Sequence, residues 1–527
     1  MRLRRSLSVA SAAVALLVAV PAAASQAGTS SSGSGSGSGS GSSSGTGGEP
    51  KYRATSFNLA VEAEDYTNVL ERQSLYLQPG YQLQLREIGL QNGLAATNIE
   101  LHDPQREFVS DLCWNGYDGC AGDTRLYNWQ KDGYGIVAPF VFTARNGAQL
   151  SGHVWATRSG PARRPGIVIT NGSVQADEQM YWYDAQALAK DGYVVMTFDP
   201  QGQGQSDTAG QGKDVLEGVP AQTDGRPFYD GTEDAIDFFL STPSHPYQPV
   251  ASCNSGTSHA AYQDSRVKAG FDAAYNPFWS ILDRKELGIA GHSYGAGAVS
   301  YIGQWDKRVK AIVAWDNLGA PAPAGREQGC VDAADRRPAP IRVPALGMSA
   351  DYFLPPTPHT KLPAYDSKDT ESLVYSKHHV DTGEIVVRGG SHLDFSFIPN
   401  PAFGASLYGP DMIAWYTDAW FDYYVKGEKS AYDRLVTTRW QHDPVEAKID
   451  AFHDPNMFSF YYRSRLDIRK PEGGRFDCEE LRRGCPGMTS HDGFHGVWSY
   501  AKVDTTKDGR ARHPVPKGQG LYLPDAS

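Results

Sequence analysis

The sequence predicts an α/β protein with a mostly parallel sheet, an N-terminal antiparallel hairpin and helices on both faces. Two apolar segments, 136–144 and 150–156, flank Asn146-Gly147, a dipeptide typical of a β-hairpin turn. Strand-like and helix-like segments then alternate between residues 166 and 425, as expected when crossover helices join parallel strands. Catalytic groups in such a sheet belong at the carboxyl ends of the strands.

Each predicted element follows from its local pattern. Short apolar stretches bounded by turn residues predict strands at 166–170, 193–198, 287–290, 309–315, 345–348 and 384–388. Apolar residues that recur every three or four positions predict helices at 177–190, 232–240 and 411–425. Small apolar residues at 296–302 predict a further helix start, and Gly427 is the expected stop of the last helix.

The N-terminal residues have the pattern of an export signal. Arginines at positions 2, 4 and 5 precede an apolar stretch at 9–20 that is too short to span a bilayer, and Ala22-Ala23-Ala24 offers a cleavage site. Arg4-Arg5 also matches a twin-arginine signal. We therefore expect a secreted protein without a stable membrane anchor.

Composition divides the rest of the chain of 527 residues into segments. Nearly pure Gly and Ser at 30–48 predict a flexible linker, and the polar C-terminal part predicts an extension. The expected organisation is a signal peptide at 1–24, a linker at 25–50, an N-terminal extension at 51–135, a catalytic domain at 136–435, and at 436–527 an extension packed on the core.

The net charge of −11 argues against a nucleic-acid partner, because phosphate binding needs a basic face. The pattern leaves the oligomeric state open.

Six cysteines agree with export to an oxidising compartment. Two pairs share the spacing C-x6-C, which leaves the other two cysteines as a long-range pair. Among the several possible connectivities, this spacing favours Cys113 with Cys120, Cys478 with Cys485, and Cys253 with Cys330. No C-x2-C or paired-histidine spacing is present, so no metal site is expected.

Residues 291–295, Gly-His-Ser-Tyr-Gly, carry the most chemical information. They form a G-x-S-x-G pattern between a predicted strand and a predicted helix. The glycines permit a very tight turn, at whose tip the Ser293 hydroxyl is exposed above a helix N-terminus. Ser293 is therefore the predicted nucleophile. The alternative is a chance match, since the chain has 56 glycines.

A serine nucleophile needs an imidazole to take its proton, and the imidazole needs a carboxylate to fix its tautomer. His392 is the predicted base, because it follows the strand at 384–388 and small residues precede it. Asp351 is the predicted acid, because it leaves the strand at 345–348. Asp316, which ends the preceding strand, is the alternative acid. Turn or cap chemistry is the non-catalytic interpretation of both aspartates.

Two backbone N–H groups must face the negative charge that forms on the attacked carbonyl oxygen. One is expected from Tyr294, the residue after the nucleophile. The other is expected from Ser173 or Val174, in the loop that follows the strand at 166–170.

With these residues in place, the segment 136–435 resembles the α/β-hydrolases. More narrowly, it is similar to the dienelactone-hydrolase-like and secreted bacterial polyester hydrolase (cutinase-like lipase) group. The resemblance is carried by the motif at 291–295, Ala-Trp-Asp at 314–316, Val-Pro-Ala at 343–345, Gly-Ser-His at 390–392 and Ala-Trp-Phe at 419–421.

The resemblance implies the α/β-hydrolase fold, a triad of Ser293, His392 and Asp351, and a substrate-pocket role for Trp315. Tyr294 departs from the Met that is usual in the polyester enzymes. A Ser-Tyr pair is also common in prolyl-oligopeptidase-like and dipeptidyl-peptidase hydrolases.

Together these patterns predict a secreted serine hydrolase of the carboxylesterase, lipase or polyester-hydrolase type. It would cleave small or polymeric carboxylic esters through an acyl-enzyme intermediate and would need no cofactor. A peptidase or amidase with the same triad is the first alternative. A non-catalytic hydrolase-fold binding protein is the second, and such proteins typically lose a triad residue, whereas this chain has a candidate for each.

Overall fold

The computed structural model describes most of one compact unit, Pro50–Ser527. The described residues are 64, 68, 78–106, 129–130, 135–173, 177–217, 225–253, 255–321, 339–353, 365–396, 409–443, 447 and 453–490. The predicted signal peptide and linker lie outside them, as do Val174, Cys113, Cys120 and Cys330.

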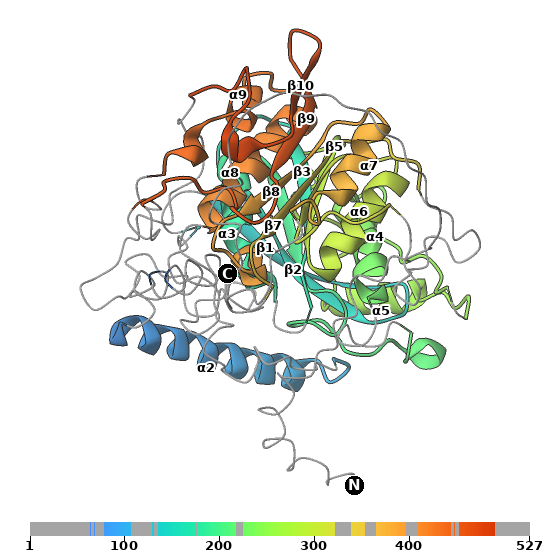
Figure 1. Ribbon diagram of the computed structural model, residues 1–527. Coiled ribbons are helices and arrows are strands. Elements are labelled where there is room, and N and C mark those ends of the chain that lie inside the picture. The colour runs from blue at the N-terminus through green and yellow to red at the C-terminus, as the bar shows by residue number, and fades with distance from the viewer. Residues whose placement is uncertain are drawn as a thin grey trace, which may run out of the picture. The chain divides into compact units, whose positions relative to one another are not determined.

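A mixed sheet of ten strands forms the centre of this unit (Figure 1). Its strands are β1 Gly135–Thr143, β2 Gln149–Thr157, β3 Arg164–Thr170, β4 Val194–Phe198, β5 Leu282–His292, β6 Val309–Trp315, β7 Ala345–Ala350, β8 Thr382–Val387, β9 Arg465–Arg469 and β10 Arg475–Cys478. They lie in the order β1-β2-β4-β3-β5-β6-β7-β8-β9-β10. The pairs from β4 to β8 are parallel, so these strands share one carboxyl edge.

The predicted antiparallel hairpin is confirmed as β1 and β2, which pair from Gly135–Thr157 to Thr143–Gln149. Gly147 lies in the turn with φ of 86°, a left-handed conformation that glycine adopts without steric cost. The hairpin joins the parallel strands through an antiparallel pairing of β2 with β4.

Helices cover both faces of the sheet. The α-helices of the described residues are α2 Pro79–His102, α3 Trp182–Lys190, α4 Arg226–Phe239, α5 Ala260–Ala269, α6 Tyr294–Trp305, α7 Thr370–Lys377, α8 Gly409–Phe421 and α9 Ala431–Leu435. Short 3-10 turns are η4 Glu178–Tyr181, η5 Gly212–Asp214, η8 His392–Ser396, η10 Arg439–Gln441 and η11 Leu481–Arg483, and η9 Asp422–Lys426 is a π-helix.

Strand alternation explains how the sheet can be covered twice. On β3, Ile167 and Ile169 join the core that includes α3 and α8, whereas Val168 joins the core that includes α4 and α6. Successive side chains of a strand point to opposite faces, so each inner strand must be apolar throughout. Figure 1 shows the two helical layers, α3 and α8 on one side of the sheet and α4, α6 and α7 on the other.

The observed helix boundaries differ from the predicted ones at several helix ends. Helix α4 begins at Arg226, earlier than predicted, because Pro227 suits the first turn of a helix. The predicted helix at 177–190 is divided into η4 and α3. The predicted helix at 411–425 is α8 followed by η9, and Gly427 ends it in the left-handed conformation at φ of 73°, as expected.

The C-terminal segment, predicted to be an extension packed on the core, supplies two strands to the sheet. Strand β9 pairs antiparallel with β8, and β10 pairs with β9, so this segment lengthens the sheet. These strands were not predicted, because both are short and carry charged residues that interrupt any apolar run. The expected disulfide between Cys478 and Cys485 is present. Among the residues the structure describes, no helix combines the length and the apolar character needed to cross a membrane.

Asp184 is a buried carboxylic acid within this core. It lies on α3 with no exposed surface, and neither carboxylate oxygen has a hydrogen-bond partner in the described part of the chain. Burial raises the pKa of Asp184 well above its ordinary value, because the charged form is poorly solvated there.

Asp184→Asn is expected to raise the free energy of unfolding at pH 7. A raised folded-state pKa means that this group favours folding most below the unfolded pKa of about 4, and that its contribution declines as pH rises from there. The gain of the variant over the parent should therefore shrink toward pH 4. Urea unfolding at several pH values measures this difference. Asp264→Asn, at an exposed aspartate on α5, is the control and should show no such trend. Equal stability of Asp184→Asn and the parent at pH 7 would contradict the expectation.

Candidate active site

Ser293 lies at the sharp turn between β5 and α6. Its φ of 56° and ψ of −117° are outside the regions that ordinary residues prefer, and α6 begins at the next residue. A Cβ at Gly291 would lie 2.4 Å from the carbonyl oxygen of Gly295, and a Cβ at Gly295 would lie 2.4 Å from that of Asn171. The two glycines of the motif are therefore required by close backbone approach, as the sequence predicted.

His392 and Asp316 form a direct pair. The Nδ1 atom of His392 lies 2.5 Å from Oδ2 of Asp316, and the two side chains are only 12% and 14% exposed. Asp316 directly follows β6, and His392 opens η8 shortly after β8. The backbone N–H of His392 also donates to the carbonyl oxygens of Tyr352 and Phe353. Hydrogen bonds therefore hold His392 through both its imidazole ring and its backbone.

The carboxylate of Asp316 is held in its charged form. Burial opposes the charge, but the hydrogen bond and charge of His392, together with the charge of Lys368, lower the pKa of Asp316 below its ordinary value. A charged acceptor on Nδ1 places the proton of the neutral imidazole on that nitrogen. The Nε2 atom of His392 is then left as a base.

The structure pairs His392 with Asp316, the alternative acid, and gives Asp351, the predicted acid, other partners. The Oδ2 atom of Asp351 accepts the backbone N–H of Gly389 at 2.8 Å, and Oδ1 accepts the hydroxyl of Ser459. Asp351 therefore fixes the loop that leads to His392, and the carboxylate on the imidazole belongs to Asp316. Sequence could not separate the two, because both aspartates follow neighbouring parallel strands at the same edge of the sheet.

The loop after β3 lies against Ser293, the predicted nucleophile. A Cβ at Gly172 would lie 3.1 Å from Cβ of Ser293, so the neighbouring Ser173 remains a candidate donor to an oxyanion, together with Tyr294. The N–H of Gly172 itself is used, because it donates to the Tyr181 hydroxyl at 2.9 Å. Val174, the alternative to Ser173, lies outside the described residues.

Trp315 does not line a pocket as expected. Its side chain has no exposed surface, and its Nε1–H donates to the hydroxyl of Thr417 on α8 at 3.1 Å. The indole also stacks on Tyr181, with the ring centres 6.2 Å apart and the planes 3° from parallel. Trp315 belongs to a strand covered on both faces, so it supports the site from the core.

Three aromatic side chains adjoin the site without having been predicted. The rings of His292 and Phe353 lie 4.4 Å and 4.9 Å from that of His392, and Tyr181 contacts His292. Phe353 is 62% exposed, so it presents an apolar surface beside His392. The signal for His292 was its position next to Ser293 in the sequence. Nothing in the local pattern marked Tyr181 or Phe353.

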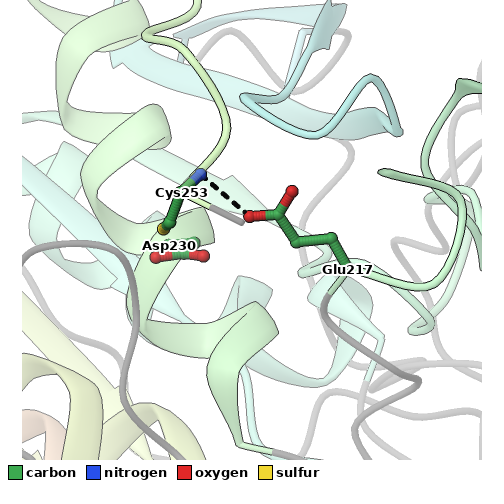
Figure 2. A group of neighbouring side chains, drawn as sticks. All are labelled: Glu217, Asp230 and Cys253. Atoms are coloured by element: carbon green, nitrogen blue, oxygen red, sulfur yellow. Dashed lines mark hydrogen bonds between the residues drawn. The ribbon is translucent and has the colours of Figure 1, made fainter. Parts of the chain in front are cut away.

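Two acidic clusters elsewhere have the spacing of a metal site but not its chemistry. Figure 2 shows Glu217, Asp230 and Cys253, where the carboxylate of Glu217 accepts the backbone N–H of Cys253 at 3.0 Å. The sulfur of Cys253 is part of a disulfide and cannot act as a thiolate ligand. The partner in that disulfide lies outside the described residues. The second cluster, Asp191, Asp418 and Asp422, is paired with Lys426 and Arg434.

Comparison with family models finds no match for the chain, and comparison with curated proteins finds no relative. Any assignment therefore depends on the geometry of the site.

Exchange of the two aspartates for asparagine should separate their roles. In Asp316→Asn the amide favours the wrong tautomer of His392, so reaction of Ser293 with a fluorophosphonate should slow by about 10⁴-fold. Asp351→Asn should slow this labelling reaction by no more than about tenfold, the effect expected from the loss of one ordinary hydrogen bond. Labelling rates followed by mass spectrometry measure both. A larger loss in Asp351→Asn would return the acid role to that residue.

Proposed function

We propose that this protein is a secreted serine hydrolase that cleaves carboxylic ester bonds, with Ser293 as nucleophile, His392 as base and Asp316 as acid. One observation carries the proposal. An imidazole and a charged carboxylate, 2.5 Å apart, lie at the sheet edge where a G-x-S-x-G serine occupies a strand-to-helix turn. Those are the three groups that acyl transfer to a serine requires.

The reaction would proceed in two steps. Ser293 attacks the ester carbonyl carbon while Nε2 of His392 takes its proton, and the alcohol leaves with that proton when the tetrahedral intermediate collapses. Water then attacks the acyl-enzyme, with His392 again as the base. Asp316 remains charged throughout and stabilises the imidazolium. The backbone N–H groups of Tyr294 and Ser173 are the proposed donors to the oxyanion.

The arrangement of the sheet supports an α/β-hydrolase fold for the catalytic domain. An antiparallel hairpin leads into parallel strands, the nucleophile follows β5, and the base follows β8, near the end of the parallel part. In this chain the acid follows β6, the strand next to β5, rather than β7.

The surroundings of the base favour a substrate with an apolar part. Phe353, the exposed ring beside His392, offers a flat apolar contact to an acyl chain or an alcohol group. Small and polymeric esters both meet this description. An amide substrate, the alternative, would need the amine to be protonated as it departs.

Ser293→Ala should abolish ester hydrolysis, with kcat reduced by about 10⁶-fold, because the residual rate comes only from binding and the oxyanion donors. Hydrolysis of a p-nitrophenyl ester measures the loss. The control is Ser265→Ala, at an exposed serine on α5, which should keep the parent rate. Hydrolysis by Ser293→Ala at close to the parent rate would refute the nucleophile.

A p-nitrophenyl ester and a p-nitroanilide with the same acyl group should separate an esterase from a peptidase. The ester should be the better substrate by at least about 10³-fold in kcat/KM, because phenolate leaves without prior protonation. Initial rates measured by absorbance give both values. Comparable values for a peptide anilide would favour the peptidase or amidase alternative.

A further inference from the structure

The hydroxyl of Tyr181 connects the loop after β3 to the residue beside the nucleophile. The backbone N–H of Gly172 lies 2.9 Å from the Tyr181 oxygen, and this oxygen lies 2.7 Å from Nδ1 of His292. Tyr181 is fully buried and His292 is 2% exposed. No step of the proposed reaction uses either side chain, so the network needs another explanation.

The direction of these hydrogen bonds fixes the tautomer of His292. A backbone N–H can only donate, so the Tyr181 oxygen accepts from Gly172. Tyr181 is fully buried, and its proton would be left unpaired unless it is donated to Nδ1 of His292, its other hydrogen-bond partner among the described residues. The proton of the His292 ring is therefore on Nε2. Burial, and then the positive charge of His392, lowers the pKa of His292 well below its ordinary value, so the ring stays neutral.

The fixed ring of His292 lies directly against the base. The centres of the His292 and His392 rings are 4.4 Å apart, with the planes tilted by 41°. Tyr181 is itself held by its stacking on Trp315. A continuous set of contacts therefore extends from the core through Tyr181 and His292 to His392.

We propose that Tyr181 and His292 are positioning residues for His392, and that this pair also ties the oxyanion loop to the base. The inference rests on the proposed function. The Tyr181 hydroxyl sets the orientation and tautomer of His292, and the His292 ring limits the movement of the His392 imidazole. The ring carries no charge, so it does not oppose the imidazolium that forms on His392 in each step.

The titratable and charged groups that face this pair come from several elements. Tyr181 on η4 and His392 on η8 contact His292 directly, and Asp316 after β6 faces both imidazoles. Lys368 acts on Asp316, and the charges of Asp177 and Asp199 act on Tyr181. The proton in the hydrogen bond between His392 and Asp316 can be followed by NMR. Its resonance depends on the geometry of that hydrogen bond, so it shows whether a change at Tyr181 or His292 moves the His392 ring.

The decisive variant is Tyr181→Phe, which removes one hydroxyl and keeps the ring that stacks on Trp315. We expect kcat for a p-nitrophenyl ester to fall by about 10- to 100-fold with KM changed by less than about threefold, because the base is displaced while substrate contacts remain. The downfield proton resonance of the His392–Asp316 hydrogen bond should shift or broaden. Tyr247→Phe is the matched control. Its buried hydroxyl donates to the carbonyl oxygen of Thr143, so its loss should cost stability and leave both readouts unchanged.

A second variant tests whether the two residues act as one unit. His292→Gln removes the ring and keeps an acceptor for the Tyr181 hydroxyl. If the ring is what positions His392, this variant should also lose kcat, and Tyr181→Phe/His292→Gln should be no slower than the slower single variant. The proposal is overturned if Tyr181→Phe keeps kcat within about threefold of the parent, if its loss appears only in KM, or if the two losses multiply.

Failure of this inference is distinguishable from failure of the proposed function. Fluorophosphonate labelling of the parent at Ser293 tests the function alone. If Ser293 is labelled and Tyr181→Phe is labelled at the parent rate, the positioning role is refuted and the hydrolase proposal stands. If the parent is not labelled at Ser293, the hydrolase proposal fails first and the positioning role fails with it.

Discussion

The hydrogen bond between Asp316 and His392 is the interaction on which the site depends, and the pairing of β5 with β6 makes it possible. His292 is opposite Trp315 in this pairing, and the N–H of Ser293 donates to the carbonyl oxygen of Trp315 at 2.9 Å. Ser293 and Asp316 therefore each follow the last paired residue of two adjacent parallel strands. Both residues lie at one edge of the sheet because these two strands end together.

Electrostatics and burial act together at this point. A carboxylate removed from water would ordinarily lose its charge, yet Asp316 keeps it because His392 and Lys368 compensate the loss of solvation. His292 shows the opposite outcome, since burial and the neighbouring His392 both disfavour its protonation. Two imidazoles 4.4 Å apart thus have different surroundings, since His392 bonds a charged carboxylate and His292 stays neutral against the core.

Other carboxylates hold the loops that carry the site. Asp199 is nearly fully buried, and its Oδ1 accepts from the side chain of Asn171 and from the backbone N–H of Glu178, both at 2.8 Å. Its Oδ2 accepts the backbone N–H of Gln205 at 3.0 Å. Asp351 does the same for the loop before His392. These acids stabilise backbone that has no strand or helix of its own to satisfy its hydrogen bonds.

Local pattern was sufficient for the α/β class, for the hairpin at Asn146-Gly147 and for the inner strands, because apolar runs and turn residues reflect burial and backbone geometry directly. It was also sufficient to select Ser293 and His392 as candidates, since each is marked by its position relative to one strand. Strands β9 and β10 were not predicted. Strand β9 joins the sheet by pairing with β8, which is far away in the sequence, and β10 then pairs with β9.

The sequence by itself selected Ser293 and His392 as candidates, and it predicted that both would lie at one edge of a parallel sheet. Only the tertiary structure decided which aspartate bonds His392, that Trp315 is buried, and that Tyr181 and His292 form a contact path to His392. The physical reason is that strand order and register bring together residues from separate segments. A hydrogen bond of 2.5 Å depends on that arrangement in space, which no local pattern records.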